Sequence, residues 1–230
     1  LSLVGSEMCI RDSPILSDGE LQWSTEPSEN SDEGVLARAA SPFHAEGGIQ
    51  LLTGNIGRSV IKVSAVSNEN KCVRAEAIVL SDPSELKKLY DAEQLNKDAV
   101  IVVPNQGPKA NGMPELHQLM PILLNIQSAG HKVALITDGR MSGASGAVPA
   151  AIHMVPEAAD DGMIGLIRTG DMITLDAIAG SLNIEVDSAV FKTREYDRSM
   201  TCRESVGRQL FQNDRKIVSN AEKGASTLFD

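Results

Sequence analysis

Two segments of the chain combine charged, amide and hydroxyl side chains with glycine and proline. The first is GPKANGMPE (107–115), where Lys109, Asn111 and Glu115 supply a cation, an amide and a carboxylate. Glycine and proline fix an irregular backbone path, so the three groups would be held in place to bind a polar ligand. The same residues also fit a plain turn with a solvated lysine and a helix-start glutamate favoured by the helix dipole.

The second segment is TDGRMSGASG (137–146), in which three glycines fall within eight residues. Such glycines allow a close backbone approach and positive φ angles, so Asp138, Arg140 and Ser142 are predicted to converge at the mouth of a strand. A glycine-rich turn can bind phosphate through its amides, but no GK[ST] follows, and Ser142 lacks the GxSxG spacing of a hydrolase. The alternative is a tight strand exit whose glycines only avoid clashes.

Both segments follow apolar runs, AVIVVP from Ala99 and KVALIT (132–137), which predict buried strands that present loops. Further strands are predicted at 58–66, 73–80, 162–168, 171–178 and 181–186. Helices are predicted from Asp82 onward, at 114–127 and at 205–221. Many short strands with few helices indicate a mixed α/β fold with a partly closed sheet or barrel. A regular βαβ succession is disfavoured because the last three strands follow one another too closely.

Composition narrows the class of protein. Hydrophobic residues make up 42% of the 230 residues but aromatics only 3%, so the core must be aliphatic. The net charge of −10 argues against nucleic acid, and no apolar run is long enough for a membrane span. The cysteines form no CxxC pair, which favours a reducing cytoplasm; they are Cys9, Cys72 and Cys202. The histidines show no metal-ligand spacing and are interpreted as surface or satisfied interior residues; they are His44, His117, His131 and His153.

The amino-terminal part of the chain differs from the rest. Residues 1–13 do not start with Met and lack the cationic and apolar regions of a signal peptide, and we interpret them as a non-native leader. Residues 14–42 are rich in Ser, Glu, Asp and Pro, which is typical of a linker or peripheral segment. We therefore predict one folded domain over residues 43–230.

The exact residue order of the two polar segments is specific enough to be compared with known protein families. GPKANGMPELH (107–117) and TDGRMSGASGAVPAAIHMVPEA (137–158) resemble signature stretches of the family that includes dihydroxy-acid dehydratase and 6-phosphogluconate dehydratase. LTGNIGRSVIKVSAV (52–66) and GLIRTGDMITLD (165–176) resemble the same family, so the resemblance covers about residues 43–230. KANGMPELH and the ending SVGRQLF…AEKGAS resemble its phosphogluconate branch.

The resemblance implies a swivelling β-barrel-like domain flanked by helices, as in the carboxyl-terminal domain of the family. Such enzymes remove water from a 2,3-dihydroxy acid to give a 2-keto acid. In the matching segments, Ser142 would be the base and Glu115 a ligand of Mg²⁺, an ion that prefers oxygen. Lys109, Asn111 and Arg140 are carried over as hypotheses for orienting the acid or its phosphate.

The resemblance also implies an iron–sulfur cluster, of the 4Fe-4S type, acting on the C3 hydroxyl. Its cysteines and the other Mg²⁺ ligands would lie in an amino-terminal domain, so this chain is expected to be a carboxyl-terminal fragment, inactive alone. The parent activity would be cytoplasmic dehydration of 6-phospho-D-gluconate in the Entner–Doudoroff pathway, by a homodimer without nucleic-acid or membrane partners. The alternatives are another sugar acid or dihydroxy acid as substrate, or a non-catalytic swivelling module.

Overall fold

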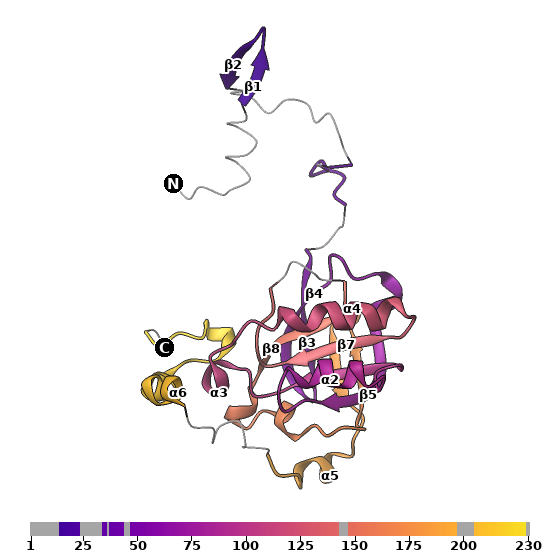
Figure 1. Ribbon diagram of the computed structural model, residues 1–230, viewed down its shortest axis with the longest axis vertical. Coiled ribbons are helices and arrows are strands. Elements are labelled where there is room, and N and C mark those ends of the chain that lie inside the picture. The colour runs from indigo at the N-terminus through magenta and orange to yellow at the C-terminus, as the bar shows by residue number, and fades with distance from the viewer. Residues whose placement is uncertain are drawn as a thin grey trace. The chain divides into compact units, whose positions relative to one another are not determined.

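Eight strands form a closed barrel in the computed structural model, in the order β10-β3-β4-β8-β7-β6-β5-β9 (Figure 1). The structure describes residues 14–23, 34–35, 37–43, 47–142, 147–196 and 205–228. Strands β5 to β8 run parallel, whereas β3, β4 and β9 make antiparallel pairs. The predicted mixed α/β barrel is confirmed. Its strands are β3 Ile49–Gly54, β4 Gly57–Lys62, β5 Cys72–Val79, β6 Ala99–Val103, β7 Val133–Thr137, β8 Ala150–Val155, β9 Met172–Asp176 and β10 Ser181–Ile184.

Strands β6 and β7 are buried along their whole length, as their continuous apolar sequences predicted. Side chains alternate between two cores, because successive residues of a strand point to opposite faces. Val100 and Val102 join the cluster inside the barrel, whereas Ile101 and Val103 join a cluster outside it. Helices α2 (Glu85–Asp91) and α4 (Met120–Ser128) cover that outer face (Figure 1).

The cores are aliphatic, as the composition predicted. Phe191 is the one aromatic residue among the buried side chains of the described part of the chain. Apolar burial contributes about 25 cal/mol per Å², so branched aliphatic side chains provide the main favourable term for this fold.

The strand predicted at 162–168 is wrong, because a 3₁₀ helix, η5, occupies Met163–Leu166. Hydrogen bonds from Gly165 N to Gly162 O and from Ile167 N to Ile164 O close its turns. Gly162 lies against backbone, since a Cβ atom there would approach Pro156 O to 1.9 Å. The apolar run is buried in the barrel core through Ile164 and Leu166, without a partner strand.

Other elements differ from prediction in their limits. The helix predicted at 114–127 begins at Met120, after the 3₁₀ helix η2 (His117–Leu119). The helical pattern at 205–221 divides into α6 (Val206–Leu210), α7 (Gln212–Ile217) and the 3₁₀ helix η6 (Ala221–Lys223). Strands β3 and β8 were not predicted. The remaining helices are α3 Pro108–Asn111, α5 Ser188–Lys192, and the 3₁₀ helices η1 Asn68–Asn70 and η4 Ala158–Asp160.

The chain divides into two compact units, Leu1–Glu46 and Gly47–Asp230. Within the first, β1 (Pro14–Ser17) and β2 (Glu20–Trp23) form an antiparallel hairpin. Its Asp-Gly turn has φ angles of 53° and 82°, a conformation that this dipeptide favours. Residues 1–13 lie outside the described part, and the predicted boundaries at 13 and 42 stay predictions. Among the residues described, no helix has the length and apolar character needed to cross a bilayer.

Candidate functional site

The two polar segments of the sequence leave the barrel side by side. Strands β6 and β7 are parallel, with Val103 paired to Thr137, so the loops that follow them begin at the same end of the barrel. Thr137 Oγ1 donates to Val103 O at 2.7 Å and so reinforces this junction. The close approach also requires Gly139, because a Cβ atom there would lie 2.6 Å from Cβ of Gln106. Gly143 and Gly146 lie outside the described residues.

Asp138 holds these loops together from inside the protein. Its carboxylate is fully buried and accepts hydrogen bonds from Asn105 N at 3.1 Å, Gln106 N at 2.7 Å and Ala158 N at 2.9 Å. Burial raises the pKa of Asp138, although the three N–H groups oppose this effect. The prediction that Asp138 converges with Arg140 and Ser142 is therefore wrong, because its carboxylate is occupied in joining three loops.

Glu115 is the centre of an exposed polar cluster. Its Oε1 accepts hydrogen bonds from the N–H groups of Ser142, at 2.8 Å, and His117, at 3.0 Å. Its Oε2 lies 3.2 Å from Nη1 of Arg140. The N–H of Ser142 is the largest cause that lowers the pKa of Glu115, with smaller effects from His117 and Arg140 and opposition from burial. Glu115 is therefore an anion that fixes the backbone of Ser142.

The hydroxyl of Ser142 is presented next to an imidazole. Its Oγ lies 3.4 Å from Nδ1 of His117, and the tautomer of the histidine decides which group donates. Arg140 is linked to the pair through Glu115, to which its Nη1 donates, and its Nε donates to Met113 O at 2.7 Å. The cluster thus joins one nucleophilic hydroxyl, one imidazole, one carboxylate and one guanidinium, which suits proton transfer to or from a bound acid.

Lys109 and Asn111 both lie on α3 but make different contacts. Nζ of Lys109 pairs with Oδ1 of Asp160 at 2.6 Å. The Nδ2 atom of Asn111 donates to Oε1 of Gln106 at 3.0 Å. The structure therefore brings Glu115, Arg140 and Ser142 into direct contact, while Lys109 pairs with a carboxylate instead.

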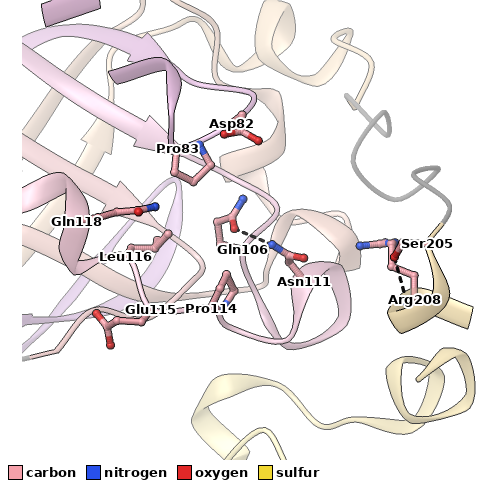
Figure 2. A pocket seen from close by; sticks show the side chains of 10 residues that line it. All are labelled: Asp82, Pro83, Gln106, Asn111, Pro114, Glu115, Leu116, Gln118, Ser205 and Arg208. Carbon is pink, nitrogen blue, oxygen red and sulfur yellow. Dashed lines mark hydrogen bonds between the residues drawn. The ribbon is translucent and has the colours of Figure 1, made fainter. Parts of the chain in front are cut away.

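A hollow of about 390 Å³ adjoins this cluster (Figure 2). Glu115 and Gln118 lie toward one end of it in this view, Gln106 and Asn111 lie in the middle, and Arg208 lies at the other end. Asp82 and Pro83, from the turn before α2, complete one wall. The hollow could therefore hold an extended polar molecule alongside Glu115.

Glu157 caps the first turn of α3. Its carboxylate accepts hydrogen bonds from Lys109 N at 2.9 Å and Ala110 N at 3.0 Å. Gly107 permits this contact, since a Cβ atom there would lie 2.4 Å from Oε2 of Glu157. Burial raises the pKa of Glu157 from 4.5 to about 7 and outweighs the two N–H groups, with smaller contributions from the charges of Asp138 and Asp160.

This raised pKa predicts a pH-dependent stability. The folded protein holds the Glu157 proton more tightly than the unfolded chain, so the stabilisation is complete below pH 4.5 and is lost as the pH rises through about 7. The loss should be about 3 kcal/mol, to be measured by urea unfolding across this range. Glu157→Gln should remove this part of the pH dependence, whereas Glu93→Gln, at an exposed position, should retain it. Equal slopes in all three proteins would contradict the prediction.

The residues present do not by themselves fit the implied metal groups. Among the described residues, Cys72 is the one cysteine, and it is exposed and free, so no set of thiolates for an iron–sulfur cluster exists there. No group of three or more His, Cys, Asp or Glu side chains within the described ranges could hold a metal ion. Glu115 could contribute one oxygen to Mg²⁺, but both of its oxygens already accept hydrogen bonds.

Sequence reasoning missed three residues around this site. His117 was interpreted as an ordinary histidine, although its place two residues after Glu115 was a usable signal. Glu157 follows β8, a strand that was not predicted, so its contact with α3 could not be foreseen. Arg208 bonds Ala110 across 98 positions of the chain, and no local pattern indicates such a contact.

Comparison with known proteins identifies the family of this chain. Residues 34–225 match the family described as dihydroxy-acid/6-phosphogluconate dehydratase, C-terminal. The chain belongs to this family of dehydratase domains, as its two signature segments indicated. Those segments are the ones that meet in the cluster around Glu115.

Individual relatives refine the comparison. The phosphogluconate dehydratase of Pseudomonas aeruginosa is 46% identical over 220 residues, covering 94% of this chain and 36% of that protein. That of Escherichia coli (strain K12) is 44% identical over 218 residues, with the same coverage. The dihydroxy-acid dehydratase of Nautilia profundicola is 31% identical over 217 residues, covering 93% of this chain and 38% of that protein. The chain thus spans little more than a third of the length of these relatives.

Proposed function

We propose that this chain is the barrel part of a phosphogluconate dehydratase, a carbon–oxygen hydro-lyase. The observation that carries the proposal is the contact between the two signature segments, in which Glu115 holds Ser142 beside His117 and Arg140. The identity of 46% to a phosphogluconate dehydratase, against 31% to a dihydroxy-acid dehydratase, favours the sugar-acid phosphate as substrate. The reaction would convert 6-phospho-D-gluconate to 2-dehydro-3-deoxy-6-phosphogluconate in the Entner–Doudoroff pathway.

In this proposal, each residue of the cluster has one role. Ser142 would act as its alkoxide, formed when Oγ gives its proton to Nδ1 of His117, 3.4 Å away. The alkoxide takes the proton from C2, and the C3 hydroxyl departs as water with the proton returned by His117, which leaves an enol that tautomerises to the 2-keto acid. Glu115 fixes Ser142 through its backbone N–H, and Arg140 and Asn111 bind the polar groups of the acid. Lys109 would reach the substrate only by giving up its pairing with Asp160.

The metal groups would depend on other parts of the full-length enzyme. A 4Fe-4S cluster and Mg²⁺ remain proposals, because the described residues supply at most Glu115 as a single Mg²⁺ ligand. A cytoplasmic location and a homodimer are proposed with them. Exposed apolar side chains on α6, on α7 and between them, among them Leu210, Phe211 and Ile217, are compatible with a contact surface.

The test joins this chain to the amino-terminal part of a phosphogluconate dehydratase. Formation of 2-keto acid is measured anaerobically, with iron, sulfide and Mg²⁺, from 6-phosphogluconate, gluconate and a branched 2,3-dihydroxy acid. We expect activity in the joined protein but not in this chain alone, and the highest kcat/KM for 6-phosphogluconate. A higher kcat/KM for gluconate or for the branched dihydroxy acid would show that the protein is a dehydratase of the same family with a different substrate. A joined protein that carries its cluster but turns over none of the three would favour the non-catalytic module.

A further inference from the structure

A second hollow, of about 320 Å³, lies beside α6 and α7 and has an unusual charge for this protein. Among the described residues, its lining includes Arg208 and Arg215 and no acidic side chain. The chain as a whole carries a net charge of −10, so a described lining with two guanidinium groups and no carboxylate has the opposite charge to most of the protein. Such a surface attracts an anion.

Both arginines are held in place by the backbone around them. Arg208 donates from Nη1 to Ala110 O at 2.9 Å, and Arg215 donates from Nη2 to Arg208 O at 3.1 Å. The Nε atom of Arg215 is buried and makes no hydrogen bond within the described part of the chain. A buried guanidinium donor without an acceptor is costly, so an anion in the hollow would stabilise the side chain if a small shift brought this N–H to the bound oxygen. The planar fork of arginine matches the oxygens of a phosphate group.

The anion-attracting hollow adjoins the hollow beside Glu115. Asn111, Ser205 and Arg208 line both of them. Figure 2 shows Arg208 and Ser205 at the end away from Glu115, with Asn111 in between. A ligand with an anionic group at one end would therefore extend from the arginines toward the Glu115–Ser142 contact.

We propose that Arg208 and Arg215 bind the phosphate group of the substrate. In a six-carbon sugar acid phosphorylated at C6, the phosphate is at the far end from C2 and C3, where water is lost. Seating the phosphate between the arginines would direct the other end of the molecule toward Glu115 and Ser142. The assignment to this substrate rests on the proposed function, whereas the anion site itself does not. Lys109, the cation that the sequence suggested for this role, lines neither hollow.

The test is a nuclear magnetic resonance titration of this chain with inorganic phosphate, 6-phosphogluconate and gluconate. We expect phosphate and 6-phosphogluconate to shift the Nε–H signals of Arg208 and Arg215 in a saturable way, and gluconate to leave them in place. Arg215→Gln should weaken 6-phosphogluconate binding by about tenfold or more, since hydrogen bonds to a charged group are lost. Arg215→Lys, which keeps the charge but not the fork, should weaken it less.

Arg74→Gln is the matched control, because Arg74 lies on β5 in an exposed pair with Glu185 and lines neither hollow. It should bind 6-phosphogluconate like the original chain. Absence of saturable phosphate binding, or the same loss in Arg74→Gln as in Arg215→Gln, overturns the inference. If the joined enzyme fails to dehydrate 6-phosphogluconate while phosphate still binds at the arginines, the proposed function fails and the anion site stands.

Discussion

Replacing Asp138 by alanine should lower the free energy of unfolding by about 4 kcal/mol. The substitution removes one acceptor group and leaves three backbone N–H groups, those of Asn105, Gln106 and Ala158, without a partner. Each buried donor left in this way costs about 1–3 kcal/mol, less where water enters the space. The three donors belong to loops after β6 and β8, so the site should loosen together with the fold.

Urea unfolding of the Asp138 variants would measure this effect. Asp138→Asn retains one oxygen acceptor but places an amide N–H₂ against a backbone donor, so its loss should be intermediate, about 2 kcal/mol. Asp91→Ala, which removes an exposed carboxylate paired with Lys87, should change stability by no more than about 0.5 kcal/mol. A loss below about 1 kcal/mol in Asp138→Ala would show that the three N–H groups find other acceptors.

Replacing Ser142 by alanine should lower kcat of the joined enzyme by about a thousandfold and leave KM nearly unchanged. The reason is that a general base acts in the transition state, whereas the substrate is held by other groups. Stability should change little, because Ser142 is exposed and its N–H contact with Glu115 does not involve the side chain.

Single-turnover kinetics with 6-phosphogluconate deuterated at C2 would separate proton removal from binding. Ser145→Ala serves as the comparison, since Ser145 belongs to the same glycine-rich segment but lies outside the described residues. A thousandfold loss in Ser145→Ala with an active Ser142→Ala would assign the base to the other serine. A rise in KM alone in Ser142→Ala would make Ser142 a binding residue.

Local sequence patterns determined most of the barrel. The apolar runs of β6 and β7 predicted buried strands because a strand covered on both faces has no polar side to show. The close spacing of β9 and β10 indicated antiparallel neighbours and hence a mixed sheet, since a parallel pair needs a long crossover. The signature segments led to the family, and they contain the three residues that meet at Glu115.

The secondary structures of β8 and of the η5 segment could not be predicted from the sequence, for the same physical reason. Both are apolar stretches bounded by glycine or proline, and such stretches look alike whether they become a strand or a 3₁₀ turn. The choice depends on whether a partner strand stands alongside. β8 has β4 and β7 as neighbours, whereas the residues of η5 insert into the barrel core.

Thus the sequence by itself determined the family, the aliphatic core and the positions of Glu115, Arg140 and Ser142 along the chain. The tertiary structure decided which polar groups are available for chemistry. Asp138 and Lys109 are charged residues of the signature segments, as Arg140 is. In the structure, however, the carboxylate of Asp138 accepts hydrogen bonds from buried N–H groups, and Lys109 pairs with Asp160. Arg208 reaches α3 from almost a hundred residues away, because the carboxyl-terminal helices pack against α3 and no local pattern indicates such a contact.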